Sequence, residues 1–272
     1  MKVQFWGTRG SYPVSGKNFT HFGGNTSCVS IHTPRYVFIF DAGTGIIPLG
    51  EALKRQSSRD LVLCLSHCHL DHIIGLPFFA PVNDPNTKLD IISCINPQYE
   101  GIQRLLSNVF SPPFFPLPWV ERRAHITYDN NLALVQRLFD NDKLALSMVN
   151  LDHPGGSCGY RLTYNKKSIC YITDTGHTPG KVDADLLEFV READLMIYDA
   201  TFTNSEFAKH QDWGHSTAAM GVKIAKLAQV KKLALFHHSP ASKDAKLHKI
   251  EQAAKTKFAG SFCAYDGMKL KV

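Results

Sequence analysis

Four residues with metal-binding side chains lie within six positions of the chain: His67, His69, Asp71 and His72. They follow segment 61–65, whose almost wholly apolar residues predict a strand buried on both faces. On extended backbone, side chains two positions apart project to the same side, so His67 and His69 can bind one ion. A turn after them would direct Asp71 and His72 toward a neighbouring position. Because imidazole and carboxylate groups bind zinc, manganese and iron, the segment predicts a transition-metal site.

Chance does not explain this spacing. With 13 histidines and 17 aspartates in 272 residues, the pattern His-x-His-x-Asp-His is expected roughly 0.002 times. Three closely spaced core histidines would also be difficult to satisfy with hydrogen bonds alone. A purely structural role for the segment is therefore a poor alternative to metal binding.

Short β-rich segments recur along the chain, and helix-like segments separate some of them. The expected strands are 2–6, 26–32, 36–40, 61–65, 88–93, 144–150, 158–164, 168–173, 194–199, 232–236 and 262–265. The expected helices are 44–55, 98–108, 183–192, 216–229 and 243–257, with Ser216 as the N-cap of the fourth. Without an internal repeat or a linker-like stretch, the sequence predicts one α/β domain over residues 1–272, with two sheets between helices.

Segment 111–119, SPPFFPLPW, does not fit either pattern, because it holds four prolines among aromatic residues. Proline cannot donate to a β-ladder and restricts the residue before it, so the segment is expected to be a loop. Two interpretations remain open. The loop either covers part of the surface, which we favour, or forms one wall of a substrate pocket.

The bulk composition sets limits on location and partners. The formal charge of +6 is mild and favours anionic ligands, but the lysines are too dispersed to form a nucleic-acid-binding stripe. No segment approaches the roughly 20 apolar residues that span a bilayer, and the N-terminus has no signal-peptide core, so a cytoplasmic protein without membrane contact is expected. Seven scattered cysteines without a C-x-x-C pair predict reduced, mostly buried thiols.

The pattern H-x-H-x-D-H after a buried strand resembles the signature of the metallo-β-lactamase superfamily, which implies an αβ/βα four-layer sandwich. The other motifs of that family have counterparts here. The segment YVFIFDAGTG supplies Asp41, and the resemblance implies that this residue orders the metal loop, residues 67–72. The segment VNLDHPGG supplies His153. YITDTG supplies Asp174, and LALFHHSP supplies His237 or His238, of which the family pattern favours His237.

The resemblance implies a pair of divalent ions, with zinc as the first expectation and manganese as the alternative. Such ions sit ~3.5–4 Å apart and lower the pKa of the water between them. The implied ligands are His67, His69 and His153 for one ion, Asp71, His72 and His237 for the other, and Asp174 as the bridge.

Further motifs indicate a branch of the superfamily. The diiron redox branch usually has Glu where this chain has His69, so hydrolysis is favoured over electron transfer. Zinc β-lactamases commonly have Cys where this chain has Asp174, which disfavours antibiotic hydrolysis.

The segments IYDATF and WGHST resemble another branch, which holds ribonuclease Z, cyclic-nucleotide phosphodiesterases and the carbon–phosphorus-lyase phosphodiesterase. In that branch the histidine corresponding to His215 stabilises the phosphate or the leaving oxygen. Here it lies beside a helix N-terminus, which favours anions. Asp199 would orient it, although ribonuclease Z has Glu there, and a capping or packing role for His215 is the alternative.

Two glycine-rich segments, GTRGSYP and GGNTSC, also resemble small-molecule phosphodiesterases of this branch. Their polar residues could contact phosphate oxygens, and the candidates are Thr8, Arg9, Ser11, Asn25 and Thr26. Arg9 could equally pair with a structural carboxylate, and the sequence does not separate the two roles.

The expected activity is hydrolysis of a small or cyclic-nucleotide-type phosphodiester by two metal ions, with Asp71 and His215 as catalytic residues. Asp71 would position the attacking hydroxide, and His215 would donate to developing negative charge. His153 and Asp174 are only 174 − 153 = 21 positions apart, which leaves no room for the tRNA-binding arm of ribonuclease Z. Three alternatives remain: a nuclease for RNA or DNA ends, a lactone or thioester hydrolase, and a non-catalytic metal-binding module. A homodimer is a further expectation.

Overall fold

The structure is a computed structural model that describes residues 1–54, 60–94, 100–129, 136–139 and 143–272. Its strands form two seven-stranded sheets. The first sheet has the order β14 (Lys269–Lys271), β1 (Lys2–Gly7), β2 (Cys28–His32), β3 (Tyr36–Phe40), β4 (Asp60–Leu65), β5 (Lys88–Ser93) and β6 (His125–Asp129). The second has the order β13 (Ser261–Cys263), β12 (Leu233–Phe236), β11 (Leu195–Asp199), β10 (Lys167–Ile172), β9 (Ser157–Tyr164), β8 (Leu144–Leu151) and β7 (Gln136–Phe139).

Both sheets change from antiparallel to parallel pairing along their width. In the first sheet β14, β1, β2 and β3 pair antiparallel, and β3 to β6 pair parallel. In the second, β7 to β10 pair antiparallel and β10 to β13 pair parallel. Parallel strands are usually buried on both faces, and β4, β11 and β12 are accordingly almost continuous apolar runs.

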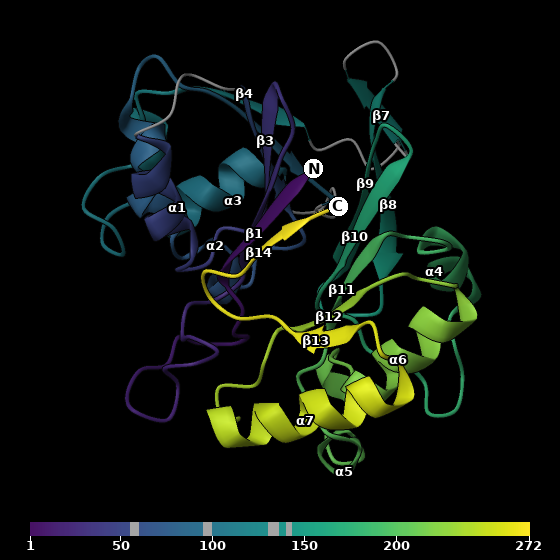
Figure 1. Cartoon of the computed structure of the whole chain (residues 1–272). Coiled ribbons are helices and arrows are strands. Elements are labelled where there is room, and N and C mark those ends of the chain that lie inside the picture. Colours follow the sequence, from purple (N-terminus) through teal and green to yellow (C-terminus); the bar gives the residue numbers. More distant parts are fainter. Residues whose placement is uncertain (55–59, 95–99, 130–135, 140–142) are drawn as a thin grey trace.

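Helices cover the outer face of each sheet (Figure 1). The helices on the side of the first sheet are α1 (Ile46–Leu53), α2 (Leu70–Ile73) and α3 (Ile102–Val109), with the 3₁₀ turns η1 (Leu76–Phe78), η2 (Ala80–Asn83) and η4 (Trp119–Glu121). The helices on the side of the second sheet are α4 (Ala184–Phe189), α6 (Ala218–Leu227) and α7 (Asp244–Lys257). The short α5 (Asn204–Phe207) and η5 (Gln211–Trp213) lie between β11 and α6. The predicted αβ/βα four-layer sandwich is confirmed.

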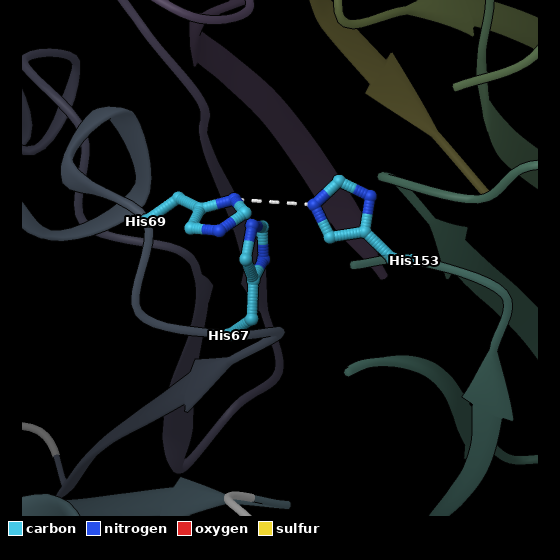
Figure 2. Close-up of side chains that lie close together, drawn as sticks. All are labelled: His67, His69 and His153. Carbon is cyan, nitrogen blue, oxygen red and sulfur yellow. Dashed lines mark hydrogen bonds between the residues drawn. The ribbon is translucent and has the colours of Figure 1, made fainter. Parts of the chain in front are cut away.

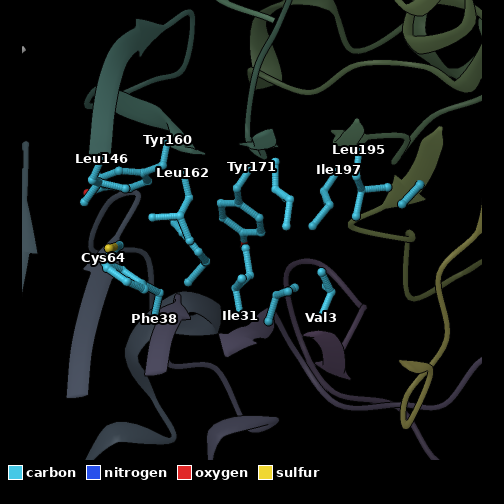
Figure 3. Packing of buried hydrophobic residues seen from close by; sticks show 14 of the residues in the cluster. Val3, Ile31, Phe38, Cys64, Leu146, Tyr160, Leu162, Tyr171, Leu195 and Ile197 are labelled. Carbon is cyan, nitrogen blue, oxygen red and sulfur yellow. The ribbon is translucent and has the colours of Figure 1, made fainter. Parts of the chain in front are cut away.

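The central core lies between the two sheets, where apolar side chains of one sheet face those of the other (Figure 3). Val3, Ile31 and Phe38 come from the first sheet, and Leu162 and Ile197 come from the second. Two further clusters fill the spaces between each sheet and its own helices. Three apolar layers therefore hold the four layers of secondary structure together.

The predicted strands agree with the structure to within two residues at each end. Three strands were not predicted, β6, β7 and β14, and neither were the short helices α2 and α5. β6 and β14 are edge strands with several exposed polar residues, so they lack a strong apolar pattern. Residue 55 of one expected helix and residues 98–99 of another lie outside the described residues.

Two local predictions are wrong. The N-cap of α6 is Thr217 rather than Ser216, because the Thr217 side chain accepts a hydrogen bond from the amide of Met220. The cysteines are not all reduced, since Cys94 and Cys158 form a disulfide between the end of β5 and the start of β9. The other five cysteines form no disulfide, and four of them are buried as expected.

The proline-rich segment 111–119 folds back over α3. Phe115 packs edge-on against Phe78 and Phe110, and Trp119 packs against Phe110. Phe114 points outward and is 81% exposed. These contacts support a covering role for the loop. No helix in the described part of the chain combines the length and apolar character needed to cross a lipid bilayer.

Candidate metal centre

The sheets bring polar residues from five strand ends to one edge of the sandwich. Asp41 follows β3, and His67 and the short helix α2 follow β4. His153 lies two positions after the end of β8, and Asp174 lies two positions after the end of β10. His237 directly follows β12. These strands run in the same direction within their sheets, so their carboxyl ends open on a common site, as in other open α/β sheets.

Three of these strand-end residues adopt a left-handed backbone conformation. The φ angles of Asp41, Asp174 and His237 are 60°, 53° and 56°. Residues other than glycine rarely take this conformation, and such strain concentrates at functional sites. Here all three side chains lie close to the ring of His72, Asp41 at 2.7 Å, Asp174 at 3.2 Å and His237 at 3.3 Å.

The first ligand group contains His67, His69 and His153, whose ligand atoms all lie within 4.8 Å of one another. Figure 2 shows the three imidazole rings converging from the metal loop on one side and from the end of β8 on the other. Nδ1 of His69 lies 3.1 Å from Nε2 of His153. The predicted pairing of His67 and His69 on one side of the chain is therefore present, with the third histidine opposite.

The second ligand group contains Asp71, His72 and His237, again within 4.8 Å of one another. Oδ2 of Asp71 lies 3.2 Å from Nε2 of His72 and 3.4 Å from Nε2 of His237. The alternative His238 points elsewhere: its Nε2 donates to the carbonyl of Ala264, and burial lowers its pKa to about 3. The structure thus brings His237 rather than His238 to the cluster.

Asp174 lies between the two groups and faces each with a different oxygen. Its Oδ1 is 3.8 Å from Nε2 of His67 and 3.8 Å from Nε2 of His153. Its Oδ2 is 3.2 Å from Nε2 of His72 and 3.3 Å from Nε2 of His237. A carboxylate in this position can bind one cation with each oxygen, which is the arrangement expected of a bridging ligand.

The hydrogen bonds of the histidines fix their lone pairs toward the cluster. Nδ1 of His72 donates to Asp41, Nδ1 of His153 donates to the carbonyl of Gly214, and Nδ1 of His237 donates to the Thr201 hydroxyl. A neutral imidazole that donates through Nδ1 carries its lone pair on Nε2. Burial lowers the pKa of His72, but Asp174, Asp71 and Asp41 raise it more, well above its usual range, so a cation that binds Nε2 of this ring takes the place of a proton. The Nε2 atoms of the three histidines and the Asp174 carboxylate converge, and such a cation holds them together.

His67 provides a further test of whether the residues fit metal ions. Its Nε2 is buried and has no hydrogen-bond partner, although buried nitrogens are rarely left unsatisfied. Burial and the neighbouring His72 hold the pKa of His67 well below its usual range, so the ring is neutral at pH 7. A neutral, buried, unpartnered imidazole nitrogen is ready to act as a ligand, and the donor set fits a pair of divalent cations.

The charges of the cluster also favour cations. Burial raises the pKa of Asp174, but His237, His72 and His67 lower it more, so the carboxylate is ionised. The pKa of Asp71 is also lowered, because its interactions with His72 and His237 outweigh its burial. Two carboxylates therefore stay negatively charged within the cluster at neutral pH.

Asp41 orders the metal loop through four hydrogen bonds. Its Oδ1 accepts from the amide of Ser66, and its Oδ2 accepts from the Ser66 hydroxyl, Nδ1 of His72 and the hydroxyl of Tyr171. The Ser66 hydroxyl oxygen in turn lies 3.0 Å from Nδ1 of His67. Asp41 is fully buried, and these donors replace the hydrogen bonds that water would make to its carboxylate.

Asp199 organises the opposite side of the cluster. Its Oδ2 accepts a hydrogen bond of 2.9 Å from Nδ1 of His215, and its Oδ1 accepts from the amide and the hydroxyl of Thr201. Thr201 in turn accepts from Nδ1 of His237. Burial lowers the pKa of His215, but Asp199 raises it more, to about 9. His215 is therefore protonated at neutral pH, and Nε2–H remains as its second donor.

The predicted phosphate contacts are placed differently. Ser11 reaches the cluster through its backbone, whose amide donates to Asp71 at 2.6 Å, rather than through its side chain. Arg9 is fully buried, and its guanidinium donates to the carbonyls of Gly23, Ser239 and Ser242. Its Nη2 also lies 3.9 Å from Oδ1 of Asp244, which supports the alternative of a structural carboxylate.

The side chains of Thr8, Asn25 and Thr26 make hydrogen bonds within the loops around the cluster. The Thr8 hydroxyl bonds to Asp266 and to a backbone carbonyl, and the Asn25 side chain accepts from Thr44. The Thr26 hydroxyl accepts from the amide of Thr44. Burial raises the pKa of Asp266 to about 6. These residues shape the loops next to the cluster instead of facing it.

Several residues that the sequence did not indicate also shape the cluster. Gly10 packs against the ring of His237, where a Cβ atom would lie 2.2 Å from Cε1. Gly214 has a φ of 72°, and a Cβ there would lie 2.4 Å from Nδ1 of His153. The YITDTG and DATF motifs contain Tyr171 and Thr201, but nothing in their spacing reveals the hydrogen bonds that they make.

The fold and the two groups of ligand side chains are those expected of a metal-dependent hydrolase, and comparison with known proteins agrees. Residues 36–238 match the beta-lactamase superfamily domain, so the chain belongs to that superfamily. A ribonuclease Z of Picrophilus torridus is 24% identical, over 100% of this chain and 96% of that protein. The ribonuclease Z of Thermoplasma acidophilum is also 24% identical, over 100% of this chain and 96% of its own.

Solved structures show the same fold. The metallo-β-lactamase fold protein YhfI of Bacillus subtilis has a TM-score of 0.73 and 18% identity, over 99% of both chains. A diphosphatase from the PhnP family has a TM-score of 0.72 and 18% identity, over 100% of this chain and 97% of its own. The short form of human tRNase Z has a TM-score of 0.67 and 23% identity, over 100% of this chain and 99% of its own. The chain is a metal-dependent hydrolase of this superfamily.

Proposed function

We propose that this hydrolase is a phosphodiesterase that acts on a small or cyclic-nucleotide-type phosphodiester. The observation that carries the proposal is the position of Asp174, which faces one group of imidazoles with each of its oxygens. Side chains arranged in this way would hold a pair of cations, which would neutralise the negative charge of a phosphodiester.

Two groups of side chains would hold the ions, which are zinc in our proposal, with manganese as the alternative. They are His67, His69 and His153 for one ion, Asp71, His72 and His237 for the other, and Asp174 for both. When bound, the ions supply a water of lowered pKa and neutralise phosphate charge. Asp71 is fixed by the amide of Ser11 and can orient the attacking oxygen. Its low pKa keeps it an acceptor throughout the pH range of a neutral enzyme.

His215 is the candidate for assisting the leaving oxygen. Its Nδ1–H is used by Asp199, so Nε2–H is the donor that remains for the substrate. The side chain is 12% exposed, which allows contact with a ligand at the surface of the cluster. Nδ1 of His215 lies 3.7 Å from Oδ1 of Asp174, so a substrate that meets the bridging position also meets this ring. Asp199 is shorter than a glutamate, but its length is sufficient for the hydrogen bond.

A nuclease that acts on RNA is the second candidate, because relatives along the whole chain are named ribonuclease Z. The segment between His153 and Asp174 argues against tRNA processing of that kind. It consists of the hairpin β9–β10 and its short connections, and no further segment is inserted there. We therefore favour a small phosphodiester as the substrate over the end of an RNA chain.

The decisive experiment is hydrolysis of bis(p-nitrophenyl) phosphate by protein loaded separately with zinc and with manganese. We expect metal-dependent turnover, and we expect His215→Ala to lower kcat by about 10²- to 10⁴-fold, the usual contribution of a general acid. His125, an exposed histidine on the edge strand β6, provides the matched control His125→Ala.

The metal content of both variants should equal that of the wild type, because His215 is not one of the proposed ligands. Unchanged turnover in His215→Ala would remove this residue from the mechanism. Absence of turnover with both ions bound would direct the search to lactones and thioesters. Release of nucleotides from a short RNA, without turnover of mononucleotide diesters, would favour the nuclease.

A further inference from the structure

The loop that carries His215 also presents an exposed tryptophan. Trp213 ends the 3₁₀ turn η5, Gly214 follows in the left-handed conformation, and His215 comes next. The carbonyl of Gly214 accepts the hydrogen bond from Nδ1 of His153, which ties this loop to the metal centre. The Trp213 side chain is nevertheless 60% exposed. A large aromatic ring is thus held at the surface two positions from the proposed general acid.

A series of rings connects Trp213 to the centre. The ring centroid of His215 lies 5.0 Å from that of His237 and 5.8 Å from that of Phe202. Phe202 in turn lies 6.4 Å from Trp213, and Trp213 lies 4.4 Å from His210. Phe202 is 8% exposed and His210 is half-buried, so Trp213 is the most exposed of these rings.

The contacts of Trp213 position its ring without covering it. His210 packs against it at an interplanar angle of 45°, and Phe202 meets it at 65°, so neither ring is stacked in parallel on it. The exposed indole surface is apolar, and removing it from water is favourable. A planar group that stacks on this ring would gain that burial together with the attraction between offset aromatic rings.

We infer that Trp213 is a specificity residue that stacks on the planar ring of the substrate, and that this ring is a nucleobase joined through a sugar to the scissile phosphate. The inference rests on the proposed function, since His215 is taken to face the leaving oxygen. The ring centroid of Phe202 lies 5.8 Å from that of His215 and 6.4 Å from that of Trp213, so His215 and Trp213 are at most about 12 Å apart, a distance that a nucleotide stacked on the indole can span. A phosphate at the metal centre therefore leaves its base within reach of Trp213.

The size of the expected effect follows from stacking in other proteins. Alanine substitution of an aromatic residue that stacks on one base typically weakens binding by about 5- to 150-fold. Because every base has a π-face, the stack should show little discrimination between bases. The preference should thus be for a base over no base, rather than for one base over another.

The test compares a ligand that carries a base with one that carries a hydroxyl group in its place. Adenosine 5′-monophosphate and ribose 5-phosphate are titrated into the zinc-loaded protein by isothermal titration calorimetry. We expect the wild type to prefer the nucleotide, and Trp213→Ala to lower that preference by about 5- to 150-fold, with most of it restored by Trp213→Tyr. Phe114 is a matched control, because it is an exposed aromatic residue in the proline-rich loop, and Phe114→Ala should keep the preference.

Each outcome bears on the inference. If the wild type does not prefer the nucleotide, or if Trp213→Ala weakens both ligands equally, Trp213 does not stack on a base. If Trp213→Ala changes the oligomeric state in size-exclusion chromatography and leaves the preference intact, the ring is a contact between copies of the chain, and the inference is wrong. If the preference depends on Trp213 but no phosphodiester is hydrolysed, recognition of the ring stands and the proposed function fails.

Discussion

The hydroxyl of Tyr171 donates a hydrogen bond of 2.8 Å to Oδ2 of Asp41 across the space between the two sheets. Tyr171 lies in β10 of the second sheet, and Asp41 follows β3 of the first. Both side chains are fully buried. Burial and the carboxylate of Asp41 raise the pKa of Tyr171 well above its usual range, so the hydroxyl remains a donor. This contact joins the second sheet to the residue that orders the metal loop of the first.

Tyr171→Phe should weaken both the fold and the metal centre. Loss of the donor leaves part of the buried Asp41 carboxylate unsatisfied, which costs about 1–3 kcal/mol in the free energy of unfolding. Because Asp41 also holds Nδ1 of His72, zinc affinity should fall by about 10- to 100-fold, as for other residues that orient a metal ligand. Urea denaturation measures the first effect, and competition with a chromophoric chelator measures the second.

Tyr160→Phe is the control for that substitution. Tyr160 is equally buried, but its hydroxyl donates to the backbone carbonyl of Leu65 instead of to Asp41. Its removal should lower stability by a similar amount and leave zinc affinity unchanged. If the two variants lose zinc affinity equally, Tyr171 has no specific role in orienting the centre.

Gly214→Ala should displace His153. The new Cβ would lie 2.3 Å from Cδ of Pro154 and 2.4 Å from Nδ1 of His153, and the φ of 72° is unfavourable for alanine. A shift of the ring by about 1 Å can cost 10²-fold in rate, so we expect turnover of bis(p-nitrophenyl) phosphate to fall by about that factor. Gly267 also has a positive φ, 91°, but open space around it, and Gly267→Ala should lose stability without losing turnover.

The sequence predicted the parts of the centre that depend on local pattern. The apolar strand β4 and the spacing of His67, His69, Asp71 and His72 place four proposed ligands within one short segment, where backbone geometry alone limits their directions. His153, Asp174 and His237 were found only through the resemblance to a family, since a single histidine or aspartate after a strand carries no signal of its own.

Contacts between segments far apart in the chain were not predictable in this way. Tyr171 and Asp41 are 130 positions apart, and nothing in either motif indicates that the strands bearing them lie face to face. Arg9 shows the same limit. Its neighbours in sequence allow a phosphate contact, but the carbonyl of Ser242, 233 positions away, accepts its hydrogen bond. Such roles are set by tertiary packing rather than by local pattern.

Asp194 should make stability depend on acid pH. Burial raises its pKa, but Lys231, Lys167 and the amide of Ser168 lower it more, to about 2 from the usual 3.8. Its stabilising effect is therefore complete above about pH 4 and is lost as the pH falls toward 2. Both lysines are at least half exposed, so screening reduces the contribution to about 1–2 kcal/mol.

Asp194→Asn tests this contribution. Urea denaturation should show the variant less stable than the wild type at pH 7, and the difference should shrink between pH 4 and pH 2. Lys54 and Glu51 form an ion pair in which both side chains are more than half exposed, so Glu51→Gln serves as a control with little effect at either pH. A difference between wild type and Asp194→Asn that stays constant over this range would show that the ion pairs do not stabilise the fold.

The disulfide between Cys94 and Cys158 should make stability depend on reductant. It closes a loop with a sequence separation of 64, which restricts the unfolded chain, and disulfides of this kind contribute about 2–4 kcal/mol to the free energy of unfolding. We expect dithiothreitol to lower the urea midpoint of the wild type accordingly. Cys94→Ser should match the reduced wild type and should not respond to dithiothreitol. A wild type whose midpoint is the same with and without the reductant would show that the bond does not form in solution or does not stabilise the fold, and alkylation of the unfolded protein followed by mass spectrometry would distinguish these two cases.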